Sequence, residues 1–160
     1  MTKFQLQTET KNGQVAVKVI GTIDEDASFS PINYAGAKSL TVDFKAVEAI
    51  NSCGVREWIR WLETVPQDIP VEYYNCPSII VDQINMVGGF LRKGVRVMSF
   101  YIPYFCDNCK LQTNVLVTSG KDFNGPNMAA PDNVKCSNCN GPTEVDVMES
   151  KYFKFMTRQG

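Results

Sequence analysis

Four cysteines carry the strongest chemical signal in this chain of 160 residues. Cys106 and Cys109 form one Cys-x-x-Cys pair, and Cys136 and Cys139 form a second pair after residues 110–135. Each pair places two thiolates on one tight turn, and two facing turns enclose a divalent ion in a tetrahedron of sulfur. The spacing therefore predicts one metal site. Zinc is the expected ion, and iron is the alternative because four tetrahedral thiolates suit both metals.

A competing interpretation is that the cysteines are free thiols, or that one pair is a thioredoxin-like redox motif. Two facing pairs are a much stronger metal signal than one Cys-x-x-Cys alone, so the metal interpretation is favoured. Four protein ligands leave no open coordination position for water. We therefore expect a structural site rather than a catalytic one.

The chain contains no histidine, which removes the commonest acid-base group near neutral pH and every Ser-His-Asp or Cys-His arrangement. Its 16 basic and 17 acidic residues nearly cancel, and no run of like charge occurs. Such a balance points neither to nucleic acid nor to an anionic membrane surface as a partner. We therefore expect a protein that is not an enzyme and that binds no nucleic acid.

The hydrophobic content of 44% is that of a globular protein with a buried core. No stretch approaches the roughly 18 to 20 apolar residues that a membrane helix requires. The opening residues also lack the apolar centre of a signal peptide. We expect a cytoplasmic protein without a membrane partner, in a compartment where thiols stay reduced and serve as metal ligands.

Residues 1–101 alternate strand and helix patterns and predict one α/β domain. The expected fold is a mixed β-sheet with covering helices, in the order β-β-loop-β-α-β-α-β. Asn51 or Ser52 is expected to cap the first helix, and Pro66 to end it. The expected elements are strands at 3–8, 14–20, 40–44, 71–76 and 95–100, a loop at 21–37, and helices after Ser52 and from Pro77 to Leu91.

Residues 102–160 have a different character and predict a small zinc ribbon as a second domain. Only two weak strand patterns occur, at 112–118 and 143–148, between stretches rich in glycine, proline and asparagine. A segment of this kind buries little core alone, and a metal ion is a common remedy. The aromatic residues Tyr152, Phe153 and Phe155 are expected to pack against the ribbon.

The segment Ile50-Asn51-Ser52-Cys53-Gly54-Val55, between a strand and an amphipathic helix, resembles the STAS domain of bacterial anti-sigma-factor antagonists. The element order and the early G-x-x-D loop from Gly21 to Asp24 are also similar to that family. In the family a D-S-S-G or D-S-T-G turn opens the helix, with a phosphorylatable Ser or Thr before the glycine. Here Asn51 and Cys53 replace the aspartate and the acceptor, so the resemblance implies a protein-binding module without the usual phospho-switch.

The resemblance also implies where a partner binds, because partners of the family dock around the turn that opens this helix. The corresponding residues here are Ser52, Cys53, Arg56, Glu57 and Arg60, beside a loop that holds Asp24 and Glu25. The expected function is thus regulatory signalling through contact with another protein, and a homo-oligomer is compatible with it.

The function and the roles of Cys53 and Trp61 each have an alternative interpretation. In place of an interaction module, the protein is a redox sensor or electron carrier if the four-cysteine centre or Cys53 is reactive. A helix N-terminus lowers the pKa of a thiol, although a half-buried packing role for Cys53 is favoured. Trp61 lies off the apolar stripe of its helix, which indicates either an interface anchor or a side chain buried at the sheet margin.

Overall fold

The computed structural model describes residues 2–158 and has the predicted α/β fold with a mixed sheet. β1 runs antiparallel to β2, and the remaining neighbours in the order β1-β2-β3-β4-β5 are parallel. Asn12 and Gly13, both with positive φ, form the predicted hairpin turn. The strands are β1 (Gln5–Lys11), β2 (Gln14–Ile23), β3 (Ser39–Ile50), β4 (Val71–Tyr74) and β5 (Val95–Val97).

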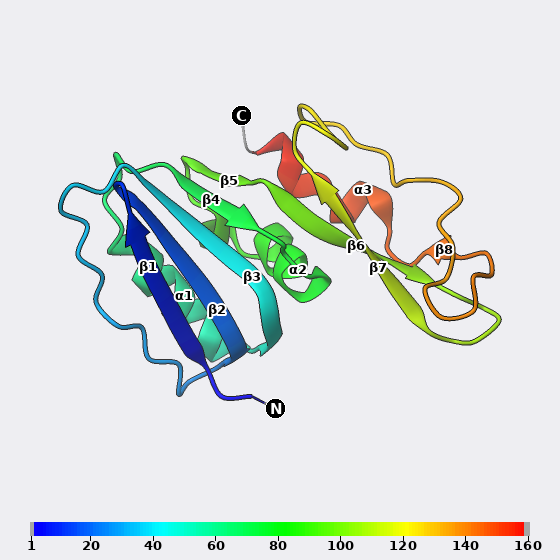
Figure 1. Ribbon diagram of the computed structural model, residues 1–160, viewed down its shortest axis with the longest axis horizontal. Coiled ribbons are helices and arrows are strands. Elements are labelled where there is room, and N and C mark those ends of the chain that lie inside the picture. Colours follow the sequence, from blue (N-terminus) through cyan, green and yellow to red (C-terminus); the bar gives the residue numbers. More distant parts are fainter. Residues whose placement is uncertain (1, 159–160) are drawn as a thin grey trace.

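Two α-helices cover one face of this sheet, as Figure 1 shows. They are α1 (Ser52–Glu63) and α2 (Ser78–Met86), and a short 3-10 helix, η1 (Gly88–Leu91), follows the second. The alternation along β2 explains the arrangement, because Val15, Val17 and Val19 are buried while Ala16 and Lys18 are exposed. The opposite face of the sheet is left to polar side chains.

Trp58 on α1 lies at the centre of the core beneath the sheet. Its ring packs against Phe44 at 5.1 Å and against Phe90 at 5.8 Å between centroids. Its indole N–H donates to the hydroxyl of Tyr73 at 3.1 Å, and that hydroxyl donates to the carbonyl of Phe90 at 2.8 Å. Every polar atom on these rings is thereby satisfied, so α1 is fixed on the sheet by both packing and hydrogen bonds.

A long loop, residues 24–38, takes the place of a helix between the parallel strands β2 and β3. Phe29 in this loop stacks on Trp61 of α1, with ring centroids 5.6 Å apart. Trp61 is consequently only 6% exposed. It belongs to the core, so its interpretation as an exposed interface anchor is wrong and burial at the sheet margin is correct.

The second helix is shorter than its hydrophobic pattern predicts. Pro77 is the residue before α2 rather than its first residue, and α2 ends at Met86. The backbone then passes through Val87 in an extended conformation into η1. Gly88 and Gly89 favour this interruption because glycine weakens a regular helix. No helix in residues 2–158 is long and apolar enough to cross a membrane.

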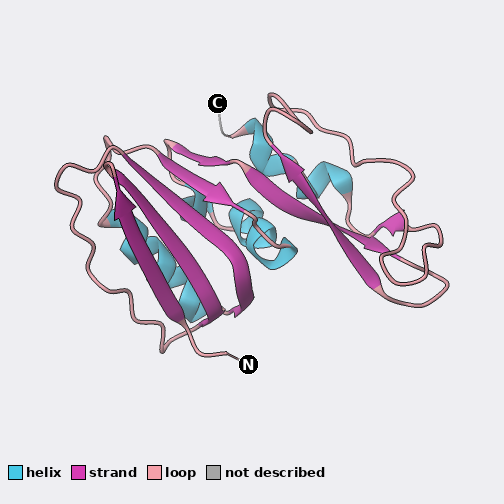
Figure 2. Cartoon of the chain, in the orientation of Figure 1, coloured by secondary structure: helices cyan, strands magenta, loops and turns pink. Residues whose placement is uncertain are grey.

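The C-terminal part contains a second, three-stranded sheet in the order β7-β6-β8. Its connections are mostly loops (Figure 2). The predicted strand at 95–100 divides between β5 and β6, and the proposed domain boundary after residue 101 falls inside β6. The elements are β6 (Ser99–Phe105), β7 (Gln112–Thr118), β8 (Glu144–Val145), α3 (Glu149–Tyr152) and the 3-10 helix η2 (Lys154–Thr157).

Phe100 joins the two parts of the molecule. A β-bridge pairs it with Cys76 directly after β4, so the first sheet leads into the second. Its ring contacts Phe153 at 6.0 Å and Phe155 at 5.3 Å between centroids. The C-terminal aromatic residues were predicted to pack against the ribbon, but they pack around Phe100 at the junction with the first sheet, and the buried side chains of both parts form a single apolar cluster.

Candidate metal centre

The first cysteine pair lies on a tight turn between β6 and β7. The amide of Lys110 donates to the carbonyl of Cys106 at 2.8 Å, and the amide of Cys106 donates to the carbonyl of Leu111 at 3.0 Å. Lys110 has a φ of 61°, a left-handed conformation that folds the chain back under the sulfurs. The side chains of Cys106 and Cys109 are thereby held on the same side of the turn.

The second pair repeats this turn in a different part of the chain. The amide of Asn140 donates to the carbonyl of Cys136 at 2.9 Å, and the amide of Cys136 donates to the carbonyl of Gly141 at 2.8 Å. Asn140 has a φ of 59°, matching Lys110 in the first turn. The same backbone hydrogen bonds and left-handed residue in both turns give two equivalent cysteine knuckles.

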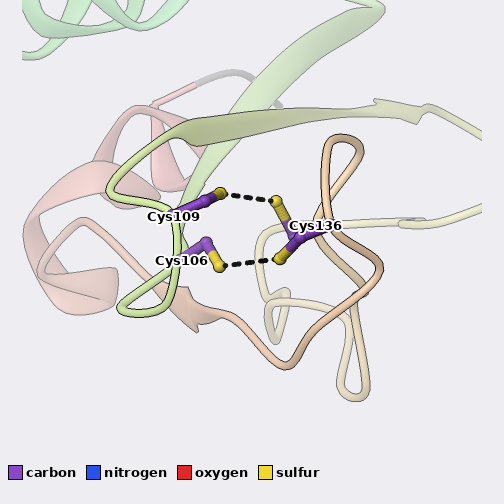
Figure 3. A group of neighbouring side chains, drawn as sticks. Cys106, Cys109 and Cys136 are labelled. Carbon is purple, nitrogen blue, oxygen red and sulfur yellow. Dashed lines mark hydrogen bonds between the residues drawn. The ribbon is translucent and has the colours of Figure 1, made fainter.

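The two knuckles face each other and bring the four sulfurs together. Cys106 Sγ lies 3.5 Å from Cys139 Sγ, and Cys109 Sγ lies 3.4 Å from Cys136 Sγ. Figure 3 shows Cys109 and Cys136 pointing toward one another from separate segments. All four sulfurs lie within 4.8 Å of one another, and each of the six cysteines is a free thiol. A tetrahedron with metal-sulfur bonds of about 2.3 Å has edges of about 3.8 Å, so the group can hold a metal ion.

The environment of the knuckles shifts the pKa values of their thiols in opposite directions. The amides of Cys139 and Asn138 lower the pKa of Cys136 to about 6. The amide of Cys109 also lowers the pKa of Cys106, but desolvation and contacts with neighbouring thiols outweigh it and raise that pKa to about 11. Near neutral pH, Cys106 therefore keeps its proton while Cys136 ionises, and a bound divalent ion would displace the remaining proton.

Side chains that the sequence analysis missed support the sulfurs. The side-chain Nδ2 of Asn108 donates to Cys139 Sγ at 3.6 Å, which lowers the pKa of that thiol. The amide of Ser137 donates to Thr113 Oγ1 at 3.0 Å and so ties the second knuckle to β7. Asn108 stands inside the first Cys-x-x-Cys pair, which is a sequence signal, whereas nothing in the sequence points to Thr113.

The four cysteines differ in their access to solvent. Cys106 and Cys136 are buried, Cys109 is half-buried and Cys139 is exposed. A closed site of this type stabilises the loops that bear its ligands, and Cys139 is the most exposed of the four ligand residues.

The turn that opens α1 is the second predicted site, and the structure assembles its parts. Asn51 caps the helix, since its side-chain oxygen accepts the amide of Gly54 at 2.8 Å. Its Nδ2 donates to Glu25 Oε2 at 2.9 Å, and this hydrogen bond lowers the pKa of Glu25. The loop that holds Asp24 and Glu25 thus lies beside the start of α1, as the resemblance implies.

The remaining predicted partner-binding residues lie on α1 and differ in their exposure. Ser52, Arg56 and Arg60 are exposed, whereas Cys53 and Glu57 are half-buried. Arg60 Nη1 lies 3.0 Å from Glu57 Oε1 in an ion pair on the helix surface. Exposed pairs of this kind contribute little to stability, so these charges are free to serve another purpose.

No protein-family model matches this chain, and no curated protein matches it. The fold and the sulfur geometry define its class as an α/β protein with a four-cysteine group that can hold a metal ion.

Proposed function

We propose that this protein is a non-enzymatic, regulatory interaction module: a STAS-like domain fused to a zinc ribbon, which binds another protein through the start of α1. The single observation that carries the proposal is the Asn51–Glu25 hydrogen bond of 2.9 Å, which joins the acidic loop to the helix start. This bond places acidic Glu25 beside the start of the helix that carries exposed Arg56 and Arg60, and a mixed-charge rim suits a reversible protein contact.

Zinc is the proposed metal, and its proposed role is structural. Four thiolates at tetrahedral spacing match the preference of zinc for sulfur ligands. Because all four positions belong to the protein, the ion has no vacant position for a substrate. Support for the STAS-like assignment comes from the order of elements and from Asn51–Gly54, the N-cap and first turn of α1 directly after β3.

The usual phospho-switch of the resembling family is proposed to be lost. The family's acceptor position is Cys53, whose thiol is not a substrate for a serine kinase, and this side chain is half-buried. Ser52 is exposed but occupies the position before the acceptor. Binding at this turn is therefore proposed to be constitutive, or to be controlled by something other than a kinase.

A capture experiment from cells tests the proposal. The intact, metal-loaded chain serves as bait, beside the double variant Arg56→Glu/Arg60→Glu and the control Lys121→Glu/Lys154→Glu, in which both reversals fall in the C-terminal part. All four side chains are exposed, so each substitution is expected to change the free energy of unfolding by no more than about 0.5 kcal/mol. Loss of the main partner only from the Arg56/Arg60 variant supports the proposal, and equal capture by both variants contradicts it.

A redox sensor or electron carrier is the second candidate, and the exposure of Cys139 favours it. An iron centre with one ligand at the surface can exchange electrons with a partner. Colour distinguishes the two candidates, because iron in four thiolates absorbs visible light and zinc does not. A red protein with one iron per chain supports the redox candidate, and a colourless protein with one zinc supports the interaction module.

A further inference from the structure

β7 is the one long edge strand in the described residues that carries no protection against pairing. The edges of the two sheets are β1 and β5, and β7 and β8. β5 and β8 have only three and two residues, and β1 carries Glu9 and Lys11. Short length and charge are the usual devices that prevent an edge strand from pairing. β7, with the sequence QTNVLVT, has seven residues and contains neither a charge nor a proline.

The hydrogen-bond register shows which backbone groups of β7 point outward. At one end of the ladder, Cys106 N–H donates to the carbonyl of Leu111, and at the other Ser119 N–H donates to the carbonyl of Met98. Residues of an antiparallel strand alternate between bonding to the neighbour and facing away from it. Given the register of the β6–β7 pair, the outward-facing amides and carbonyls belong to Gln112, Asn114 and Leu116.

The free edge stops at Thr118, the last residue of β7. The amide of Thr118 donates to Asp122 Oδ2 at 2.8 Å, and its carbonyl accepts the amide of Asp122 at 2.8 Å. Asp122 therefore occupies the outward groups of this residue and leaves the segment Gln112–Leu116 available.

Exposed apolar side chains gather at the same segment. Four large hydrophobic residues of the described chain are exposed, and two of them are Leu111 at 49% and Leu116 at 41%. These two leucines stand at either end of the free edge. An unpaired edge flanked by exposed leucines is a feature that monomeric proteins usually avoid, which indicates that something covers it.

We propose that β7 pairs antiparallel with β7 of a second copy of this chain, about a two-fold axis at Asn114. Gln112 of each copy then lies opposite Leu116 of the other, and the two Asn114 residues face each other. Each facing pair exchanges two backbone hydrogen bonds. This register therefore uses all the outward-facing N–H and C=O groups of Gln112, Asn114 and Leu116, and it leaves out those of Thr118, which already bind Asp122. The two three-stranded sheets become one continuous sheet.

The properties of the edge favour a second copy over a foreign peptide. The segment has no charge with which to select an acidic or basic strand, and for the same reason no like charges meet when it pairs with itself. A two-fold arrangement also places Leu116 of each copy at the interface, opposite Gln112 of the other, so the same contact is made on both sides of the axis.

Sedimentation velocity of the intact, metal-loaded chain over a concentration series tests the proposal. The native chain is expected to form a reversible dimer. Leu116→Lys, which places a charge on the edge, is expected to raise the dimer dissociation constant at least about tenfold. Asn114→Pro provides a second test, because it removes an outward N–H without breaking a bond to β6. The matched control is Met86→Lys, at a side chain that is 70% exposed on α2, and it is expected to dimerise normally.

Amide hydrogen exchange locates the contact. Exchange at Asn114 and Leu116 is expected to slow as the concentration rises, whereas Thr113 and Val115 are protected at every concentration by their bonds to β6. Bound metal and circular dichroism show whether each variant is folded. A native chain that stays monomeric at its highest soluble concentration overturns the proposal. So does a dimer that neither edge substitution weakens, or protection of Asn114 that appears only when a different protein is added.

Discussion

Asn85 on α2 holds the main chain of Phe155, seventy residues later: the amide of Phe155 donates to Asn85 Oδ1 at 2.9 Å. The same side chain donates through Nδ2 to the carbonyl of Tyr152, also at 2.9 Å. Arg158 adds a further hydrogen bond to the carbonyl of Ile84. The C-terminal segment is thus bound to α2, so the part with the four cysteines is packed against this helix rather than joined to the first sheet by a linker alone.

Replacing Asn85 by alanine is expected to destabilise the protein by about 2 to 3 kcal/mol, because two hydrogen bonds are lost and the amide of Phe155 is left unsatisfied. Chemical denaturation measures the change in the free energy of unfolding. Met86→Ala, at an exposed neighbour on the same helix, is expected to change it by less than about 0.5 kcal/mol. Equal effects of the two substitutions contradict this role of Asn85.

Removing the metal with a chelator is expected to loosen the knuckles while the first sheet stays folded. The metal supplies on the order of 10 kcal/mol to sites of this type, and the core around Trp58 does not depend on the four sulfurs. Amide exchange is therefore expected to accelerate at Lys110 and Asn140 and to stay slow along β3. Restored protection after metal is added back is the control. Unchanged exchange at the knuckles in metal-free protein would contradict a structural role for the ion.

Metal affinity is expected to rise with pH. The raised pKa of Cys106, about 11, means that its proton is present near neutral pH and leaves when the metal binds. Each displaced proton changes the affinity by about tenfold per pH unit. Below about pH 6 the slope is expected to steepen, since Cys136, with a pKa of about 6, is then protonated as well. Competition with an indicator chelator of known protonation measures the slope, and an affinity independent of pH between 6 and 8 rules this mechanism out.

Gly54→Ala is expected to destabilise the protein by more than about 3 kcal/mol, because overlap with the backbone cannot be relieved by a side-chain movement. The added Cβ lies 1.9 Å from the carbonyl oxygen of Ile23, at the point where β2 meets α1. Gly88→Ala is the matched control, since its Cβ meets nothing within 4 Å. Thermal unfolding of the two variants makes the comparison, and a similar loss in both would show that close packing at Gly54 is not the cause.

Much of the fold could be predicted from local patterns. The alternation of Val15, Val17 and Val19 identified the buried face of β2, and Asn51 followed by an apolar stripe identified α1. The two Cys-x-x-Cys pairs predicted the metal site because thiol chemistry and short spacing act within a few residues. Each of these features depends on residues that are close together in the sequence, so each can be predicted from the sequence without knowledge of the tertiary structure.

Tertiary structure alone decided how distant segments meet. Phe29 covers Trp61 and makes it a core residue, which no helical pattern reveals because the covering ring comes from an irregular loop. Asn85 binds a segment seventy residues away, and Thr113 supports a knuckle that begins more than twenty residues later. The edge position of β7 likewise exists only once the strands are ordered. The strand, helix and knuckle patterns were local and could be predicted from the sequence, whereas contacts across long chain separations depend on the packing of the whole chain.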